Sequence, residues 1–132
     1  MLGIILVSHS PQVAEGTAEL VRNMAGEVEM VAVGGDADGS LGTDPDRIQS
    51  AIERLESDEV LVFMDIGSAV LSAEIVLETL APEIAEKVWL VDAPFVEGAF
   101  AAGVLASTGA NAEECVEAAR EARTESKLHD EE

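Results

Sequence analysis

A histidine and an aspartate each end an apolar run, where side chains are better placed for chemistry than for packing. His9 follows the run LGIILVS at residues 2–8, and Pro11 then marks a helix start. Asp65 closes the run EVLVFMD at residues 59–65. An aspartate can accept a hydrogen bond from one imidazole nitrogen, which fixes the tautomer and leaves the other nitrogen as a nucleophile. A lone histidine can instead be a capping or partly buried structural residue, so the pair matters more than His9 alone.

A nucleophilic histidine is most useful against phosphorus, because phosphohistidine keeps a high transfer potential. Two predicted helices begin beside these residues, one after His9 and one near Gly67. Their free N–H groups can bind an anion, and the hydroxyls of Ser68 and Ser10 could add hydrogen bonds. Capping is the alternative role for Asp65 and for both serines.

The hydrophobic pattern predicts four strands that alternate with helices. The strands are expected at residues 2–8, 28–33, 59–65 and 87–92, and helices are expected to begin at 11, 45, 67, 95 and 112. Alternation of this kind is typical of a parallel sheet with helices on both faces. Ligands bind such sheets at the carboxyl ends of the strands, so we expect His9, Asp65 and Asp92 to share one rim.

The composition narrows the classes of partner. The chain has 132 residues, with 27 acidic and 7 basic residues and a net charge of −20, which repels nucleic acids and anionic membranes. The sequence has no apolar run long enough to span a membrane and no basic signal region, so we expect a cytoplasmic protein. A high-salt cytoplasm would screen the self-repulsion of such a surface.

Several common motifs are absent or incomplete. In the loop DADGS, counting from Asp36 puts Leu41 and Arg47 where a calcium loop needs glycine and glutamate. The sequence contains no GK[ST], dinucleotide fingerprint or GxSxG. His129 is the only other histidine, which argues against a transition-metal site. Cys115 fits a small buried residue of a helix.

Four segments together resemble a known family. They are LVSHS before the proline-opened helix, the GSLGTD loop, FMDIGSAVLSAE and DAPFVEGAFAA. In this order they are similar to the DhaM family, the phosphotransferase subunits of dihydroxyacetone kinase, and to the mannose-type IIA domains of the sugar phosphotransferase system. The resemblance covers residues 1–123 as one phosphotransfer domain, and residues 124–132 are expected to form an acidic, disordered tail.

The resemblance implies a three-layer α/β fold with a four-stranded parallel sheet in the order 2-1-3-4. It implies that His9 accepts a phosphoryl group from the phosphocarrier HPr and passes it to ADP on a DhaL subunit, which works with DhaK. Asp65 would orient His9, and Gly67, Ser68 and Ser10 would hold the phosphoryl group, with no cofactor or metal on this subunit. HPr and enzyme I would then be separate proteins.

The resemblance also implies a homodimer, for which the apolar helix at 95–106 is a candidate interface. A helix buried within one subunit is the alternative explanation of that pattern.

Two other functions stay open at this stage. A small tetrapyrrole metal chelatase also has a first strand that ends in histidine and serine, but it would need a second metal-handling histidine. A regulatory module that senses phosphorylation without carrying flux is the other possibility. Neither explains the DIGSA and PFVEGA segments.

Overall fold

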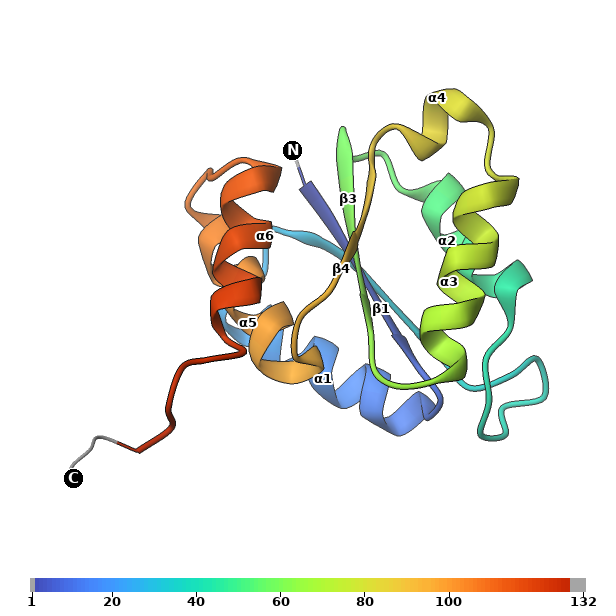
Figure 1. Cartoon of the computed structure of the whole chain (residues 1–132), viewed down its shortest axis with the longest axis horizontal. Coiled ribbons are helices and arrows are strands. Elements are labelled where there is room, and N and C mark those ends of the chain that lie inside the picture. Colours follow the sequence, from blue (N-terminus) through green and yellow to red (C-terminus); the bar gives the residue numbers. More distant parts are fainter. Residues whose placement is uncertain (1, 129–132) are drawn as a thin grey trace.

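The chain folds into one α/β unit, and the computed structural model describes residues 2–128 (Figure 1). The strands are β1 (Leu2–Ser8), β2 (Glu29–Gly34), β3 (Glu59–Met64) and β4 (Val88–Val91). The helices are α1 (Pro11–Met24), α2 (Pro45–Arg54), α3 (Ser68–Thr79), α4 (Pro82–Ala85), α5 (Phe95–Ser107) and α6 (Ala112–Glu121).

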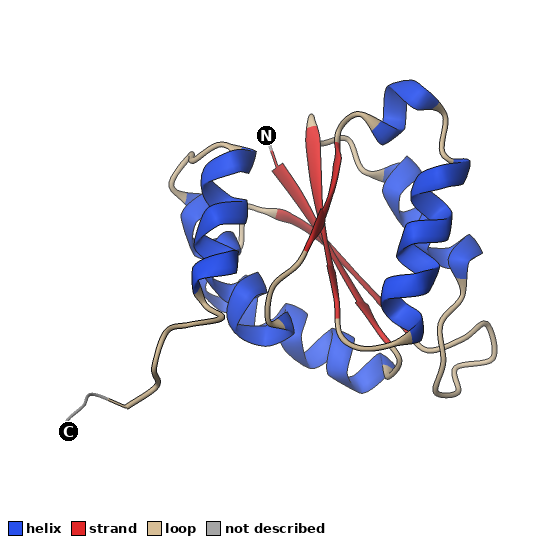
Figure 2. Cartoon of the chain, in the orientation of Figure 1, coloured by secondary structure: helices blue, strands red, loops and turns tan. Residues whose placement is uncertain are grey.

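The four strands form a single parallel sheet in the order β2-β1-β3-β4, which confirms the predicted topology. Figure 2 shows the sheet between two helical layers. One hydrophobic core joins the sheet to α1, α5 and α6, with Ile4, Leu6 and Phe63 facing it. The other joins the sheet to α2 and α3, and the alternate residues Ile5, Val7 and Val62 face that side. Because both faces are covered, β1 and β3 are apolar at nearly every position.

The register of the central strands brings the candidate residues together. Val7 of β1 lies opposite Met64 of β3, and the N–H of Asp65 donates to the Val7 carbonyl at 3.1 Å. On the other side of β1, Ser8 lies opposite Gly34. The chain therefore leaves β1 beside the end of β3, with His9 next to Asp65.

Gly34 lets α1 begin close to the sheet. A Cβ atom on Gly34 would lie 2.5 Å from the Cα of Pro11 and 2.6 Å from the Ser10 carbonyl oxygen, so a side chain has no room there. This close approach fixes the turn that carries His9.

Helix α5 packs one face within the subunit, while its apolar residues Val96 and Phe100 stay exposed, so the predicted dimer interface stays a prediction. Gly98, Ala99, Ala102 and Gly103 are buried, and a Cβ atom on Gly103 would lie 2.4 Å from the Val21 side chain of α1. The small residues of α5 are thus explained by contacts with α1 and its neighbours.

The structure adds one helix and confirms two local predictions. The short helix α4 follows Ala81 and was not predicted; four residues with no buried member leave no periodic apolar signal. Asn111 and Glu114 form the expected capping box at the start of α6. Cys115 is buried, as predicted. Part of the predicted tail, including His129, lies outside the described residues. Across residues 2–128, no helix is both long and apolar enough to cross a membrane.

Candidate functional site

The Asp65 carboxylate contacts His9 at two points, the backbone N–H and the imidazole ring. Oδ1 of Asp65 lies 3.1 Å from Nδ1 of His9, and Oδ2 accepts the His9 backbone N–H at 3.2 Å. A carboxylate can only accept, so Nδ1 carries the hydrogen and Nε2 keeps its lone pair in the neutral ring. The His9 side chain remains 28% exposed, which leaves the ring accessible from solution.

The Asp65 carboxylate stays ionised because it accepts several hydrogen bonds. Partial burial by itself would raise its pKa, but the Ser8 hydroxyl at 2.7 Å and the Ile66 N–H at 2.6 Å both donate to it. With the two bonds from His9, these donors place the pKa of Asp65 below its ordinary value. Asp65 is therefore a fixed anion beside Nδ1 rather than a proton carrier.

Ser68 lies on the opposite side of the ring. Its Oγ is 2.7 Å from Nε2 of His9, so this serine contacts the nitrogen that Asp65 leaves free. Ser68 is the first residue of α3, and that helix has no side-chain cap. The capping role considered for Ser68 and Asp65 is thus not found at this helix start.

Gly67 is the N-cap residue of α3. Its φ of +42° is one that glycine adopts without the strain of a Cβ atom. It turns the chain so that α3 begins beside His9, and its N-terminal N–H groups lie at the rim.

Two predicted residues have other contacts. The hydroxyl of Ser10 accepts the Val13 N–H at 3.3 Å, which confirms its capping role in α1. Asp92 lies at the same rim, as expected, where it lines one hollow together with Asp65, but its side chain does not join the pair. Its side chain is 91% exposed and pairs with Arg123 at 3.1 Å, because the short strand β4 ends at the edge of the sheet.

Three hydroxyl residues of the site were missed by sequence reasoning. The buried Ser8 donates to Asp65 and accepts the Ser10 N–H at 3.0 Å, which ties the end of β1 to the start of α1. Thr43 contacts both Ser68 and Ser72, which joins the three hydroxyls in one cluster. All three lie in motifs quoted above, Ser8 in LVSHS, Thr43 in GSLGTD and Ser72 in FMDIGSAVLSAE, but nothing in those patterns assigned a role to their hydroxyls.

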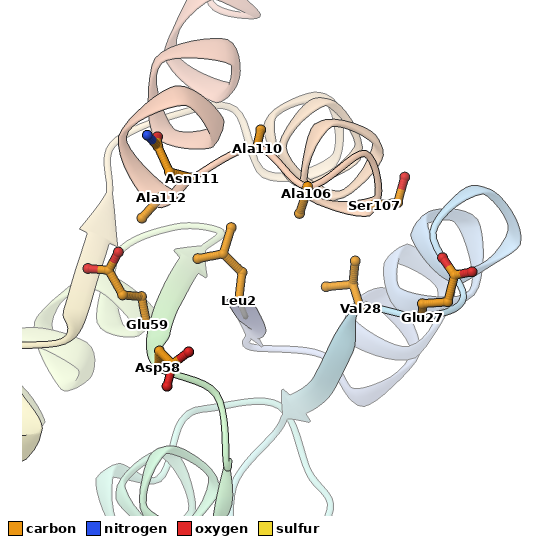
Figure 3. Close-up of a pocket in the computed structure, with 11 residues that line it drawn as sticks. Leu2, Glu27, Val28, Asp58, Glu59, Ala106, Ser107, Ala110, Asn111 and Ala112 are labelled. Atoms are coloured by element: carbon orange, nitrogen blue, oxygen red, sulfur yellow. The ribbon is translucent and has the colours of Figure 1, made fainter.

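A hollow of about 490 Å³ lies at the other end of the sheet (Figure 3). Leu2, Val28 and Asp58, near the amino ends of the strands, line it together with the turn between α5 and α6. It shares no residue with the His9 site. Within residues 2–128, no three histidine, cysteine or acidic residues are grouped so that they could hold a metal ion.

Comparison with known proteins identifies the family of the chain. The EIIA-man family, described as "PTS system fructose IIA component", matches residues 3–119. A phosphoryl donor subunit DhaM of PEP-dependent dihydroxyacetone kinase 2 from Listeria innocua is 46% identical over 79% of this chain and 85% of its own length. The DhaM phosphotransferase subunit of Lactococcus lactis is 39% identical over 84% of this chain and 87% of its own.

Longer relatives and solved structures complete the comparison. DhaM of Escherichia coli is 45% identical over 88% of this chain, which spans only 26% of that protein. The crystal structure of EF1359, a protein of unknown function, has a TM-score of 0.89 and 37% identity, and the match covers 97% of this chain and 98% of that one.

A phosphotransferase system component EIIA from Streptococcus agalactiae shares the fold, with a TM-score of 0.67 at 17% identity, over 93% of this chain and 92% of that one. The family model and these relatives show that the chain belongs to the EIIA-man family and, within it, groups with the DhaM subunits of dihydroxyacetone kinases.

Proposed function

We propose that the chain is the phosphoryl-relay subunit of a dihydroxyacetone kinase that depends on phosphoenolpyruvate, with His9 as the residue that carries the phosphoryl group. The observation that carries this proposal is the His9 ring, held at Nδ1 by Asp65 and contacted at Nε2 by Ser68. The names of the DhaM relatives supply the reaction to which this geometry is suited.

In the first step, His9 takes the phosphoryl group from the phosphohistidine of HPr. The lone pair of Nε2 attacks phosphorus in line, a new P–N bond forms, and the P–N bond of the donor breaks. The electron pair of that broken bond returns to the imidazole of the donor. Asp65 accepts the Nδ1 hydrogen throughout, so the positive charge that develops on the His9 ring lies next to a carboxylate.

In the second step, His9 gives the group to ADP held by a DhaL subunit, which works with DhaK. An oxygen of the ADP β-phosphate attacks phosphorus, the P–Nε2 bond breaks, and its electron pair returns to Nε2. The site is then ready for another turnover without any net proton transfer to Asp65.

The phosphoryl oxygens need donors that do not compete with the partner proteins for space. The hydroxyl of Ser68 lies at the ring, and the backbone N–H groups of Gly67 and Ser68 open α3 next to it, so these groups can supply them. The N–H groups of Ala69 and Val70 already donate to carbonyls of the same turn. Ser10 starts α1 on the adjacent turn, and its hydroxyl is a further donor in the proposal. Backbone dipoles are already oriented, so they cost little reorganisation as charge develops.

Exposed apolar side chains beside the site suit docking of protein partners. Ile66 is 66% exposed and follows Asp65, and Leu41 is 75% exposed in the loop whose Gly42 N–H donates to the His9 carbonyl at 2.9 Å. With a net charge of −20, recognition would rest on shape and apolar contact more than on charge steering. A homodimer, cytoplasmic location and adaptation to high salt are parts of the same proposal.

A reconstituted relay tests this function. The chain is mixed with DhaK, DhaL loaded with ADP, HPr, enzyme I, phosphoenolpyruvate and dihydroxyacetone, and formation of dihydroxyacetone phosphate is followed. We expect flux with the unaltered chain and none with His9→Gln, which should keep its melting temperature. Flux that survives His9→Gln would contradict the assignment of His9, and no flux with active partners would contradict the assigned pathway.

A further inference from the structure

The free lone pair of His9 is occupied by a hydroxyl in the resting site. Nδ1 donates to Asp65, so Nε2 must accept, and the hydrogen between Nε2 and Ser68 belongs to the serine. Ser68 Oγ lies 2.7 Å from Nε2 in this arrangement. A phosphorus atom bonded to Nε2 would lie closer than a hydrogen-bonded oxygen, so Ser68 has to turn aside when the phosphoryl group arrives.

Thr43 contacts Ser68, the residue that contacts the ring. Its Oγ1 donates to Ser68 Oγ at 3.2 Å and lies 3.4 Å from the Ser68 carbonyl oxygen. It also lies 2.8 Å from Oγ of Ser72, which is only 7% exposed and sits one turn further along α3.

One set of hydrogen positions satisfies these contacts apart from the 3.4 Å contact between Thr43 and the Ser68 carbonyl, which competes for the single hydrogen of Thr43. Ser72 donates to Thr43, Thr43 donates to Ser68, Ser68 donates to Nε2 of His9, and Nδ1 donates to Asp65. Every hydroxyl in this chain gives one hydrogen bond and accepts at most one, which is within its capacity. The chain of hydrogen bonds is therefore directional and ends on the acceptor nitrogen.

Hydrogen bonds from Arg47 and from Gly42 hold the loop that carries Thr43. Arg47 donates from Nη1 to the carbonyls of Gly34 at 2.9 Å and Gly35 at 3.0 Å. Nearer to Thr43, the Gly42 N–H donates to the His9 carbonyl at 2.9 Å. These bonds hold the loop beside the end of β2 and beside His9.

We infer that Thr43 is a positioning residue that acts on His9 through Ser68. Its donation occupies a lone pair of Ser68 Oγ, which leaves the Ser68 hydrogen for Nε2 before transfer and for a phosphoryl oxygen afterwards. The inference rests on the proposed function for its second half, whereas the resting contact with Nε2 is independent of any phosphoryl donor.

The effect of Thr43 on His9 can be measured without chemistry. The ¹⁵N resonances of the neutral His9 ring report whether Nε2 accepts a hydrogen bond. We expect Thr43→Val to shift the Nε2 resonance toward that of a free imidazole nitrogen, and Thr43→Ser to restore it. In the Ser68→Ala background, Thr43→Val should produce no further shift.

The second measurement is the rate of phosphoryl uptake from phospho-HPr in a single turnover. Thr43→Val should slow uptake by about 3- to 10-fold, the range for one lost neutral hydrogen bond. Thr43→Ser should recover the rate, and Thr43→Val should add nothing once Ser68 is alanine. Thr108→Val is the matched control, because the Thr108 hydroxyl donates to Leu105 at the far end of α5.

The outcomes separate the inference from the proposed function. An unchanged Nε2 resonance in Thr43→Val, or equal slowing of uptake with and without Ser68, would overturn the inference even if the unaltered chain is phosphorylated. A chain that is never phosphorylated would overturn the proposed function and the transfer half of the inference together. If Thr43→Val lowers the melting temperature, Thr43→Ser restores it and the Nε2 resonance does not change, then Thr43 only stabilises the fold and the inference is overturned.

Discussion

Replacing Asp65 by asparagine should slow phosphoryl uptake because the amide cannot satisfy all four donors that face the carboxylate. If the amide oxygen accepts from Nδ1, its NH₂ group faces the backbone N–H of His9, which can only donate. If the amide is flipped, NH₂ faces Nδ1 and favours the tautomer that protonates Nε2. Either arrangement disturbs the ring that the proposed reaction uses.

The magnitude follows from the kind of hydrogen bond that is lost. A bond to a charged group contributes about 1.5–3 kcal/mol. Loss of about 1.4–2.7 kcal/mol of transition-state stabilisation slows a reaction by roughly 10- to 100-fold, which is also the range for losing an orienting partner of a functional histidine. We therefore expect Asp65→Asn to slow single-turnover uptake by roughly 10- to 100-fold, and Asp65→Ala to fall in the same range.

Rapid-quench mixing with phospho-HPr, followed by intact mass, measures this rate. Asp92→Asn is the matched control, since Asp92 ends the neighbouring strand but is solvent-exposed and pairs with Arg123. Melting curves must show that each variant is folded. Uptake by Asp65→Asn at the unaltered rate would refute the orienting role, and equal slowing by Asp92→Asn would show that net charge, rather than this contact, sets the rate.

Four further predictions concern stability and reactivity. The pKa of Asp65 is lowered in the folded chain, so the stability that its carboxylate contributes is present above the ordinary value of 3.8 and is lost as pH falls through the folded pKa. The difference in unfolding free energy between the unaltered chain and Asp65→Asn should therefore shrink below pH 4, and a constant difference would contradict this. Burial, aided by Glu114, raises the pKa of the Cys115 thiol to about 11, so a thiol reagent at pH 8 should react only after denaturation, and rapid labelling of the folded chain would show that the thiol is accessible. Gly103→Ala should lower the free energy of unfolding, measured in urea, by about 1–3 kcal/mol through overpacking. Gly16→Ala, with no atom within 4 Å of the added Cβ, should raise it by about 0.4–1 kcal/mol. Equal effects of the two substitutions would refute the packing argument. Removal of salt should lower the melting temperature because 27 acidic residues repel one another. An unchanged melting temperature in low salt would contradict the hypothesis of a high-salt cytoplasm.

The sequence was sufficient for the parts of the fold that local patterns determine. Apolar runs of β-branched residues predicted the four strands to within one residue at each end, because strands buried on both faces have no polar interruptions. Proline and asparagine signals located the starts of α1, α2 and α6. The pair His9 and Asp65 was predicted because strand order and strand ends together determine which residues meet at the rim.

The contacts that depend on side-chain direction were not predictable in the same way. Asp92 ends a strand as Asp65 does, yet it lies on the edge strand and turns to solvent. Ser8 was read as part of an apolar run, although its buried hydroxyl donates to Asp65. Thr43 reaches Ser68 from a loop separated from it by 25 residues, and no periodicity links the two positions.

Phosphorylation of His9 tests the account most directly. The chain is incubated with phosphoenolpyruvate, enzyme I and HPr in high salt, beside His9→Ala, and the intact mass of both is measured before and after acid treatment. The account predicts a gain of one acid-labile phosphoryl group that is absent from His9→Ala. The unaltered chain gaining no phosphoryl group from active carriers, or His9→Ala gaining one, would contradict it.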